Sequence, residues 1–213
     1  MRDVATALSL TPTRSLPDTV TAAAADDAMV LKAYLTPHPD GYYIVCGAES
    51  PADGDRVSGE QLGHLLSQLS EIFRFVIIDT APGLGEHALA ALEAATDAVF
   101  LCDMSVPGAR GLRKEIAALT TVGIMPSARH VVLNFADRVS GLSVRDIEAT
   151  IGVPVDIAVP RSSAVTLSTN RGVPLLQDGR KDPASAALNR LVCRFDPGAK
   201  LKRGRLHRRV VVA

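Results

Sequence analysis

The chain has 213 residues, a length that fits one α/β domain with at most a small appendage. Lys plus Arg and Asp plus Glu both number 23, so the zero net charge excludes a chain that binds nucleic acid through its overall charge. Aromatic residues make up 4% and tryptophan is absent, which argues against a base-stacking platform, while a hydrophobic fraction of 47% suffices for a sizeable core.

The N-terminus and the cysteines indicate the cellular compartment. The opening stretch MRDVATALSL carries Asp3 and lacks a long apolar core, so it is not a secretory signal. No stretch approaches the length of a membrane span. Cys46, Cys102 and Cys193 are unclustered and lie in apolar runs, as small core residues of a reduced protein do. We therefore expect a cytoplasmic α/β protein.

Short apolar runs alternate with helical patterns along the chain. Helices are expected at 3–8, 20–30, 57–73, 86–95, 111–122, 143–151 and 183–195, where apolar residues recur every three or four positions. Strands are expected at 41–47 (GYYIVCG), 75–79 (FVIID), 97–103 (DAVFLCD), 130–135 (HVVLNF) and 154–160 (PVDIAVP). Uniformly apolar strands separated by helices predict a three-layer α/β fold with a mostly parallel sheet between helices.

We expect one domain at 1–195, incomplete at its N-terminus, and a basic tail at 196–213. Right-handed crossovers would place the carboxyl ends of the strands at one edge of the sheet, where ligands of such folds bind. The tail includes six Lys and Arg residues, with Leu201 and Leu206 between them and the apolar residues 210–212 after them. It could contact nucleic acid or anionic lipid, but a solvated tail is the simpler interpretation.

Three polar residues end the expected strands, namely Asp79, Asp103 and Asn134. Asp79 follows four apolar residues and precedes Thr80-Ala81-Pro82-Gly83. One carboxylate at this place suits Mg²⁺, which keeps several waters and phosphate oxygens among its ligands. The Pro-Gly loop could bring backbone N–H groups near a phosphate. The alternative is that Asp79 only caps the next turn or helix.

The same stretch admits a dinucleotide-binding interpretation. Residues 83–88 fit the pattern G-x-G-x-x-A, and Asp103 ends the next strand about twenty residues later, where a ribose-binding acid would lie. An NAD-dependent oxidoreductase is therefore a less favoured hypothesis. Asp79 at the strand end opposes it, because a carboxylate there would repel a pyrophosphate.

Other catalytic patterns are missing from the sequence. It contains no H-E-x-x-H, no G-x-S-x-G and no Cys/His cluster. His87 has no evident nucleophile partner and is expected to be an exposed first-turn residue. Arg110, Arg113 and Lys114 could contact a phosphate or a partner, but a solvated helix face is the simpler interpretation.

Beyond these patterns, the sequence resembles the MinD/ParA-type P-loop ATPases. FRFVIIDTAPGLGEHALAALEAATDAVFL is similar to their Walker-B strand and following helix, and HVVLNFADRVSGLS to their strand that ends in an adenine-contacting Asn. VPVDIAVPRSSAVTLSTNRGVPLL resembles the segment that leads into their adenine-side loop. DVATALSLTPTRSL resembles the CpaE/TadZ branch, which acts in Flp/Tad pilus assembly. The likeness covers about residues 2–195.

The resemblance implies roles for particular residues. Asp79 would hold Mg²⁺ through water, Thr80 to Gly83, including Pro82, would sense the γ-phosphate, and Asn134 would contact adenine. Pro160, Arg161 and Ser162 would line the base. The family binds ATP as a dimer, hydrolyses it slowly, and moves between cytoplasm and a surface. A homodimer peripheral to the inner face of the plasma membrane, or at polar or pilus machinery, is therefore expected.

One part of the family pattern is not present. The family grips phosphate with a glycine-rich loop, K-G-G-x-G-K-[ST], yet these 213 residues contain no Gly-Lys pair. In the family the preceding strand lies beside the Walker-B strand, so we expect 75–79 to lack a neighbour. Each unmatched buried backbone group costs on the order of 1–3 kcal/mol. The expectations are an ATPase whose loop lies upstream of Met1, a non-catalytic positioning protein, or a half-site completed by another piece.

Overall fold

The computed structural model describes residues 3–48, 50–137, 139–177 and 181–197. The N-terminal elements are α1 (Asp3–Ala7), α2 (Leu16–Ala23), α3 (Ala28–Ala33), β1 (Thr36–Pro37), β2 (Tyr43–Ile44), α4 (Pro51–Gly54), α5 (Gly59–Ile72) and α6 (Glu86–Ala94). The remaining elements are β3 (Asp97–Asp103), α7 (Val106–Val122), β4 (Ala128–Ala136), α8 (Val144–Ile151), β5 (Ile157–Pro160), α9 (Ser163–Arg171) and α10 (Pro183–Phe195).

The main sheet is parallel, with strand order β3-β4-β5. Its register pairs Asp97 with Ala128 at one end and Asp103 with Asn134 at the other. The carboxyl ends of neighbouring strands therefore meet at one edge, as expected for strands joined by crossover helices.

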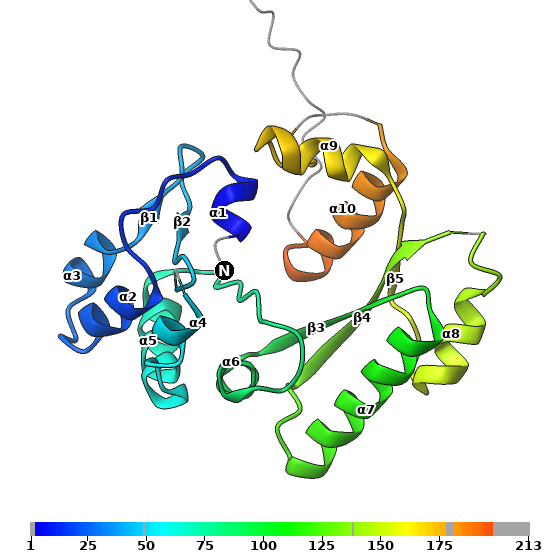
Figure 1. Ribbon diagram of the computed structural model, residues 1–213, viewed down its shortest axis with the longest axis horizontal. Helices are drawn as coiled ribbons and strands as arrows, with labels where there is room; N and C mark the ends of the chain where they lie inside the picture. Colours follow the sequence, from blue (N-terminus) through cyan, green and yellow to red (C-terminus); the bar gives the residue numbers. More distant parts are fainter. Residues whose placement is uncertain (1–2, 49, 138, 178–180, 198–213) are drawn as a thin grey trace, which may run out of the picture.

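Helices cover both faces of this sheet, which confirms the three-layer α/β fold (Figure 1). On one face, Phe100, Val131 and Leu133 pack with residues of α7 and α8. On the other face, Val132 and Val159 belong to a second core with residues of α10. The alternation arises because successive side chains of a strand point to opposite faces.

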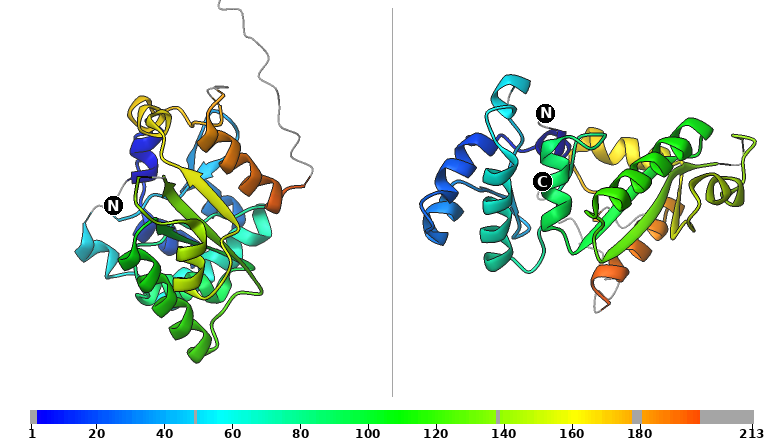
Figure 2. Two further views of the ribbon diagram at one scale, coloured as in Figure 1. Left: turned by 90° about the vertical axis from the view of Figure 1, so that its right-hand side faces the viewer. Right: turned by 90° about the horizontal axis from the view of Figure 1, so that it is seen from below.

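The N-terminal elements form a separate helical body beside the sheet (Figure 2, right). Its core joins Val20 of α2, Leu31 of α3, Leu65 and Leu69 of α5, and Ala91 of α6. The spacing of the leucines on α5 is the helical stripe that the sequence predicts. Helix α6 links this body to β3.

The expected helices that follow the strands begin and end at recognisable signals. Ser58 and Ser143 form capping boxes at the starts of α5 and α8. Gly123 and Gly152 adopt left-handed conformations, with φ of 76° and 87°, at the ends of α7 and α8. These residues give the helix boundaries a direct physical cause.

The predicted strand at 75–79 is wrong. The segment has no assigned secondary structure, and Phe75, Ile77 and Ile78 are exposed. An apolar run predicts burial, but a strand also requires a neighbour, and no described segment pairs with this one.

Four further details differ from the sequence predictions. Of the expected strand 41–47, only Tyr43–Ile44 pairs, antiparallel to Thr36–Pro37. The expected helix 20–30 is interrupted, because Asp26 is left-handed (φ 51°) and Asp27 caps a new helix. Helices α4 and α9 were not predicted. Cys46 and Cys102 are buried as expected, but Cys193 is exposed.

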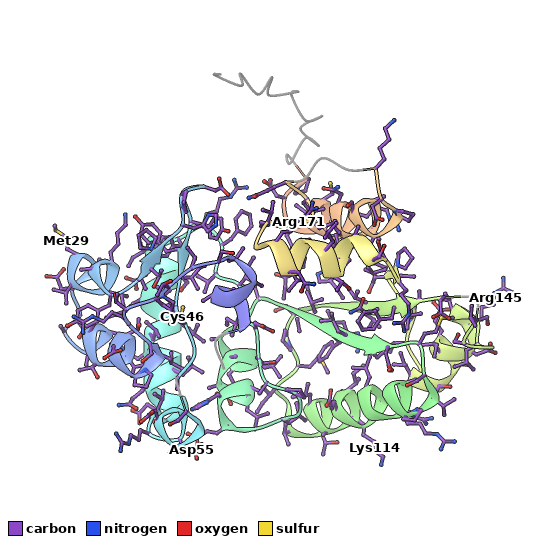
Figure 3. The ribbon with its side chains drawn as sticks, turned by 45° about the horizontal axis from the view of Figure 1, so that its top comes forward. Met29, Cys46, Asp55, Lys114, Arg145 and Arg171 are labelled. Carbon is purple, nitrogen blue, oxygen red and sulfur yellow. The ribbon has the colours of Figure 1, made fainter. Side chains whose placement is uncertain are left out.

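The outer helix faces are polar and solvated. Lys114 of α7 and Arg145 of α8 point away from the sheet (Figure 3), and Arg110 and Arg113 are also exposed. The basic residues of α7 therefore lie on a solvent-accessible helix face. Within the described part of the chain, no helix has the length and apolar character needed to cross a membrane. Residues 198–213 of the predicted tail lie outside the described residues.

Candidate functional site at the carboxyl edge of the sheet

Asp79 and the loop after it are open to solvent. Asp79, Thr80, Pro82 and Gly83 are all exposed, and Gly83 has a φ of 89° that favours glycine. The loop enters α6, whose N-cap residue has no side-chain cap. The structure therefore presents the expected magnesium and phosphate residues on one accessible loop.

Helix α6 is fixed where this loop ends. The carboxylate of Glu86 accepts a hydrogen bond from the Gly59 N–H, and a ring nitrogen of His87 contacts the Val57 carbonyl oxygen. A side chain at Gly59 would press on Glu86, with its Cβ 3.1 Å from Glu86 Cγ. His87 is half-buried and connects α6 to the start of α5, so the expectation that it is an exposed surface residue is wrong.

Asp103 and Asn134 lie next to each other because they are register partners at the ends of β3 and β4. Asp103 Oδ1 accepts a hydrogen bond of 2.7 Å from the Ser105 hydroxyl, which itself caps α7. Asn134 is half-buried, and its Oδ1 accepts the backbone N–H of Phe135 at 2.9 Å. This bond leaves the Asn134 amide NH₂ group available as a donor.

Phe135 has a strained backbone at this position. Its φ is 54°, in the left-handed region that side chains other than Gly rarely adopt. The pairing of β4 with β5 is irregular between Leu133 and Ala136, so the strained residue lies at a bulge. Bulges redirect side chains at the ends of strands, and here the bulge sets the direction of Asn134 and Phe135.

The end of β5 brings the expected base-lining segment to Asn134. Pro160 is paired with Ala136, and the Arg161 N–H donates to the Ala136 carbonyl at 3.2 Å. The Arg161 guanidinium lies 5.0 Å from the centre of the Phe135 ring, a cation–π contact. It also binds Asp137 through an Nε–Oδ2 distance of 3.4 Å. Strand β5 therefore places Pro160 and Arg161 beside β4.

Two carboxylates near this edge, Asp137 and Asp182, have lowered pKa values. The backbone N–H of Ser140, with a further contribution from Arg161, lowers the pKa of Asp137 below its ordinary value. The Ser162 hydroxyl donates to Asp182 at 2.8 Å and lowers the pKa of that carboxyl, helped by the N–H groups of Ala184 and Ser185. Both carboxylates therefore stay ionised over a wide pH range.

The structure assembles part of the predicted site. Asn134, Pro160, Arg161 and Ser162 come together through neighbouring strands, whereas no hydrogen bond among the described residues joins loop 79–83 to them. Sequence reasoning did not identify Phe135, Asp137 and Asp182. Asp182 could have been identified, because Asp before Pro is a helix-start signal; the left-handed Phe135 leaves no such signal in the sequence.

Asp79 is the residue expected to hold a magnesium ion. No group of three or more His, Cys, Asp or Glu side chains that could hold a metal occurs in the described part of the chain. Mg²⁺ needs only one or two carboxylates when phosphate and water complete its shell. The single exposed carboxylate of Asp79 fits that requirement only when a nucleotide supplies the other ligands.

The residues 83–88 do not form a dinucleotide-binding turn in the structure. The pattern requires a strand immediately before the first glycine. Residues 75–83 contain no strand, and α6 begins at Glu86. The hypothesis of an NAD-dependent enzyme therefore gains no support from this segment.

Comparison with known proteins identifies sequence relatives of this chain. No protein-family model matches the chain. The septum site-determining protein MinD assigned in Emiliania huxleyi is 29% identical over 137 residues, which are 62% of this chain and 50% of that protein. MinD of Synechocystis is 23% identical over 175 residues, 81% of this chain and 66% of that protein. The chain thus spans about half the length of the first of these relatives.

Comparison with solved structures identifies the fold. A ParA family ATPase from Chlorobium tepidum superposes with a TM-score of 0.81 at 17% identity, covering 89% of this chain and 79% of that one. MinD from Pyrococcus horikoshii, solved with Mg-ADP, gives 0.75 at 16% identity, covering 94% and 81%. The fold is that of the MinD/ParA-type P-loop NTPases. The sequence relatives to which the chain is similar are MinD proteins.

Proposed function

We propose that the chain supplies the magnesium and base-binding half of a MinD/ParA-type ATP site, and that ATP controls where the protein is positioned in the cell. The observation that carries the proposal is the convergence of Asn134, Pro160 and Arg161 at the carboxyl ends of β4 and β5. Ligands of parallel sheets bind at this edge. The MinD relatives and the MinD/ParA fold support the choice of nucleotide.

Each residue has a defined role in this proposal. Asp79 holds Mg²⁺ through a water molecule, and loop 80–83 responds to the γ-phosphate with its exposed backbone N–H groups. The NH₂ group of Asn134 donates to a ring nitrogen of adenine. Pro160, Arg161 and Ser162 line the base. The bond from the Phe135 N–H to Asn134 Oδ1 holds the amide in one orientation before the nucleotide binds.

The proposal requires a phosphate-binding segment in addition to these residues. The 213 residues contain no Gly-Lys pair, and without backbone N–H donors and a lysine the β- and γ-phosphates lose most of their partners. We infer that ATP and Mg²⁺ bind with useful affinity only where such a segment is supplied, from the same or another polypeptide.

Adenine binding is tested on the protein purified from the cells that naturally produce it. An affinity tag added after Ala213 permits this purification. Asn134→Ala should weaken ATP binding about tenfold, the effect of about 1.4 kcal/mol. The control is Asn170→Ala, because Asn170 is an exposed asparagine on α9. Equal ATP affinity of Asn134→Ala and wild type, with Asn170→Ala also unchanged, would contradict the assignment of the base site.

A second candidate function is a non-catalytic positioning or scaffold protein. The exposed loop 79–83 favours it, because no described residue donates a hydrogen bond to the Asp79 carboxylate. This function predicts that the natively purified protein is folded and does not bind Mg-ATP. Micromolar ATP affinity, measured by calorimetry, would rule it out.

We further propose a homodimer that associates with a surface on the cytoplasmic side. The resemblance of 3–16 to the CpaE/TadZ branch points to Flp/Tad pilus machinery, while the MinD relatives point to division-site positioning. A salt-dependent pelleting assay with anionic liposomes or DNA, with and without residues 200–213, tests the surface. Pelleting that does not depend on these residues would contradict a role for them.

A further inference from the structure

A cluster of polar groups joins helix α5 to the turn between α2 and α3. His64 and Gln68 are four residues apart on α5, so both lie on one side of this helix. They meet the carbonyl oxygen of Ala23, at the end of α2, and the carboxylate of Asp26 in the turn that follows. The cluster belongs to the N-terminal body and includes no residue of the proposed nucleotide site.

The polar atoms of this cluster converge on one point. Gln68 Nε2 lies 2.9 Å from Ala23 O, 2.7 Å from Asp26 Oδ1 and 3.3 Å from His64 Nε2. His64 Nε2 lies 3.0 Å from Asp26 Oδ1 and 3.3 Å from Ala23 O. The two oxygens only accept hydrogen bonds, and so does His64 Nε2 when the ring carries its proton on Nδ1. One amide group with two hydrogens then faces three acceptors.

Two further features of the cluster oppose the stability of the free protein. Gln68 Oε1 is buried and has no hydrogen-bond partner within the described part of the chain. A buried acceptor without a partner lowers stability. Asp26 has a left-handed backbone, with a φ of 51°, which is uncommon for a residue other than glycine. Backbone strain of this kind gathers at sites that bind a ligand.

A small divalent cation satisfies these groups together. One imidazole nitrogen with carboxylate and carbonyl oxygens is a donor set that suits Zn²⁺. Tetrahedral bonds of about 2.0–2.1 Å place neighbouring ligand atoms about 3.3 Å apart. The distances within the cluster range from 2.7 to 3.3 Å, so the ligand atoms need to move by only a few tenths of an ångström. Ca²⁺, with longer bonds and six to eight ligands, requires a wider cage.

The surroundings permit the ion to enter. The side chains of His64 and Asp26 are 47% and 74% exposed, which leaves a path from solvent and room to adjust. A turn of the Gln68 amide about its last side-chain bond brings Oε1 to the position of Nε2, where it faces the ion. No group of three or more His, Cys, Asp or Glu side chains able to hold a metal occurs among the described residues, so the ion also needs the amide and backbone oxygens.

We propose that His64, Asp26, Gln68 and the Ala23 carbonyl form a binding site for Zn²⁺, which fastens α5 to the turn between α2 and α3. The site goes beyond the proposed nucleotide function and does not depend on it. Zinc bound there stabilises the folded N-terminal body, because the ligands converge only in the folded chain.

The proposal is tested on the 213-residue chain with Zn²⁺ alone, by isothermal titration calorimetry and by thermal unfolding. We expect saturable zinc binding and a higher midpoint of thermal unfolding in its presence. A tenfold excess of Mg²⁺ should not displace the zinc, because Mg²⁺ prefers an octahedral shell of oxygen ligands.

The substitution Gln68→Glu distinguishes a metal site from a cluster of hydrogen bonds. A carboxylate at position 68 adds a charged ligand, so zinc affinity should rise about tenfold. Without zinc this variant should be less stable than wild type, because the new carboxylate faces Asp26. Gln61→Glu is the control, since Gln61 is exposed on the same helix, and it should leave zinc affinity unchanged.

The substitution His64→Ala removes the nitrogen ligand and should weaken zinc binding about tenfold or more. Circular dichroism verifies that each variant folds; should His64→Ala not fold, Gln68→Glu alone decides. The proposal would be overturned by a folded chain that does not bind zinc, or by equal zinc affinity of His64→Ala and wild type, which would place the ion elsewhere. A zinc affinity of Gln68→Glu no higher than that of wild type would also overturn it. None of these results involves ATP, so the test with Asn134→Ala is independent of them.

Discussion

The hydroxyl of Ser162 donates a hydrogen bond of 2.8 Å to the carboxylate of Asp182, and each of these two residues caps a helix. Ser162 Oγ accepts the Ala164 N–H at the start of α9, and Asp182 Oδ1 accepts the Ala184 N–H at the start of α10. One side-chain bond therefore ties the end of β5 to α10. It holds the segment that lines the proposed base site.

Ser162→Ala should lower the free energy of unfolding by about 1 kcal/mol, because the α9 cap is lost. Ser163→Ala is the control, since Ser163 is exposed at the first position of the same helix. Urea unfolding measures both. The double variant with Asp182→Ala should lose less than the sum of the single variants, because the residues share one bond. Additive losses would mean that the two residues act separately.

The same pair predicts a pH dependence. The Ser162 hydroxyl lowers the pKa of Asp182. Its folded pKa therefore lies below the unfolded value of about 3.9, so the stabilisation is present above that value and is lost as pH falls through the folded pKa. Asp182→Asn cannot titrate. Wild type should be more stable than Asp182→Asn near pH ~6, with the difference shrinking below pH ~4; a constant difference would contradict the role of the charge.

The strained Phe135 provides a comparison of two substitutions. Phe135→Gly and Phe135→Ala both remove the ring that Arg161 covers. Only Gly adopts the φ of 54° without strain, so the Gly variant should be more stable than the Ala variant by about 1 kcal/mol. Thermal or urea unfolding decides. An Ala variant as stable as the Gly variant would mean that residue 135 does not keep a left-handed backbone.

Substitution by Ala at two glycines of α7 should affect the stability of the protein differently. A Cβ at Gly108 would collide with the Asp103 carboxylate, whereas a Cβ at Gly111 meets nothing within 4 Å. Gly111→Ala should stabilise the protein by about 1 kcal/mol through helix propensity. Gly108→Ala should lack that gain, because it displaces the carboxylate that binds Ser105. Equal stabilisation by both substitutions in urea unfolding would contradict the close approach.

The sequence predicted most of the elements that carry the site. The apolar runs at β3, β4 and β5 are local signals, and the structure confirms them. The strand at 75–79 was predicted wrongly because pairing depends on a neighbour, which a local pattern does not contain. Asp182 acts across 20 residues on Ser162, and the backbone of Phe135 depends on a bulge between strands; neither follows from local spacing.

The most direct test of the proposed ATP site is Mg²⁺-dependent ATP turnover by the protein purified natively from its own cells. Wild type is compared with Asp79→Ala and with Asp55→Ala, an exposed acid of the N-terminal body (Figure 3). We predict turnover that requires Mg²⁺ in wild type and Asp55→Ala, and its loss in Asp79→Ala. Turnover that persists in Asp79→Ala, or none in folded wild type, would contradict the account.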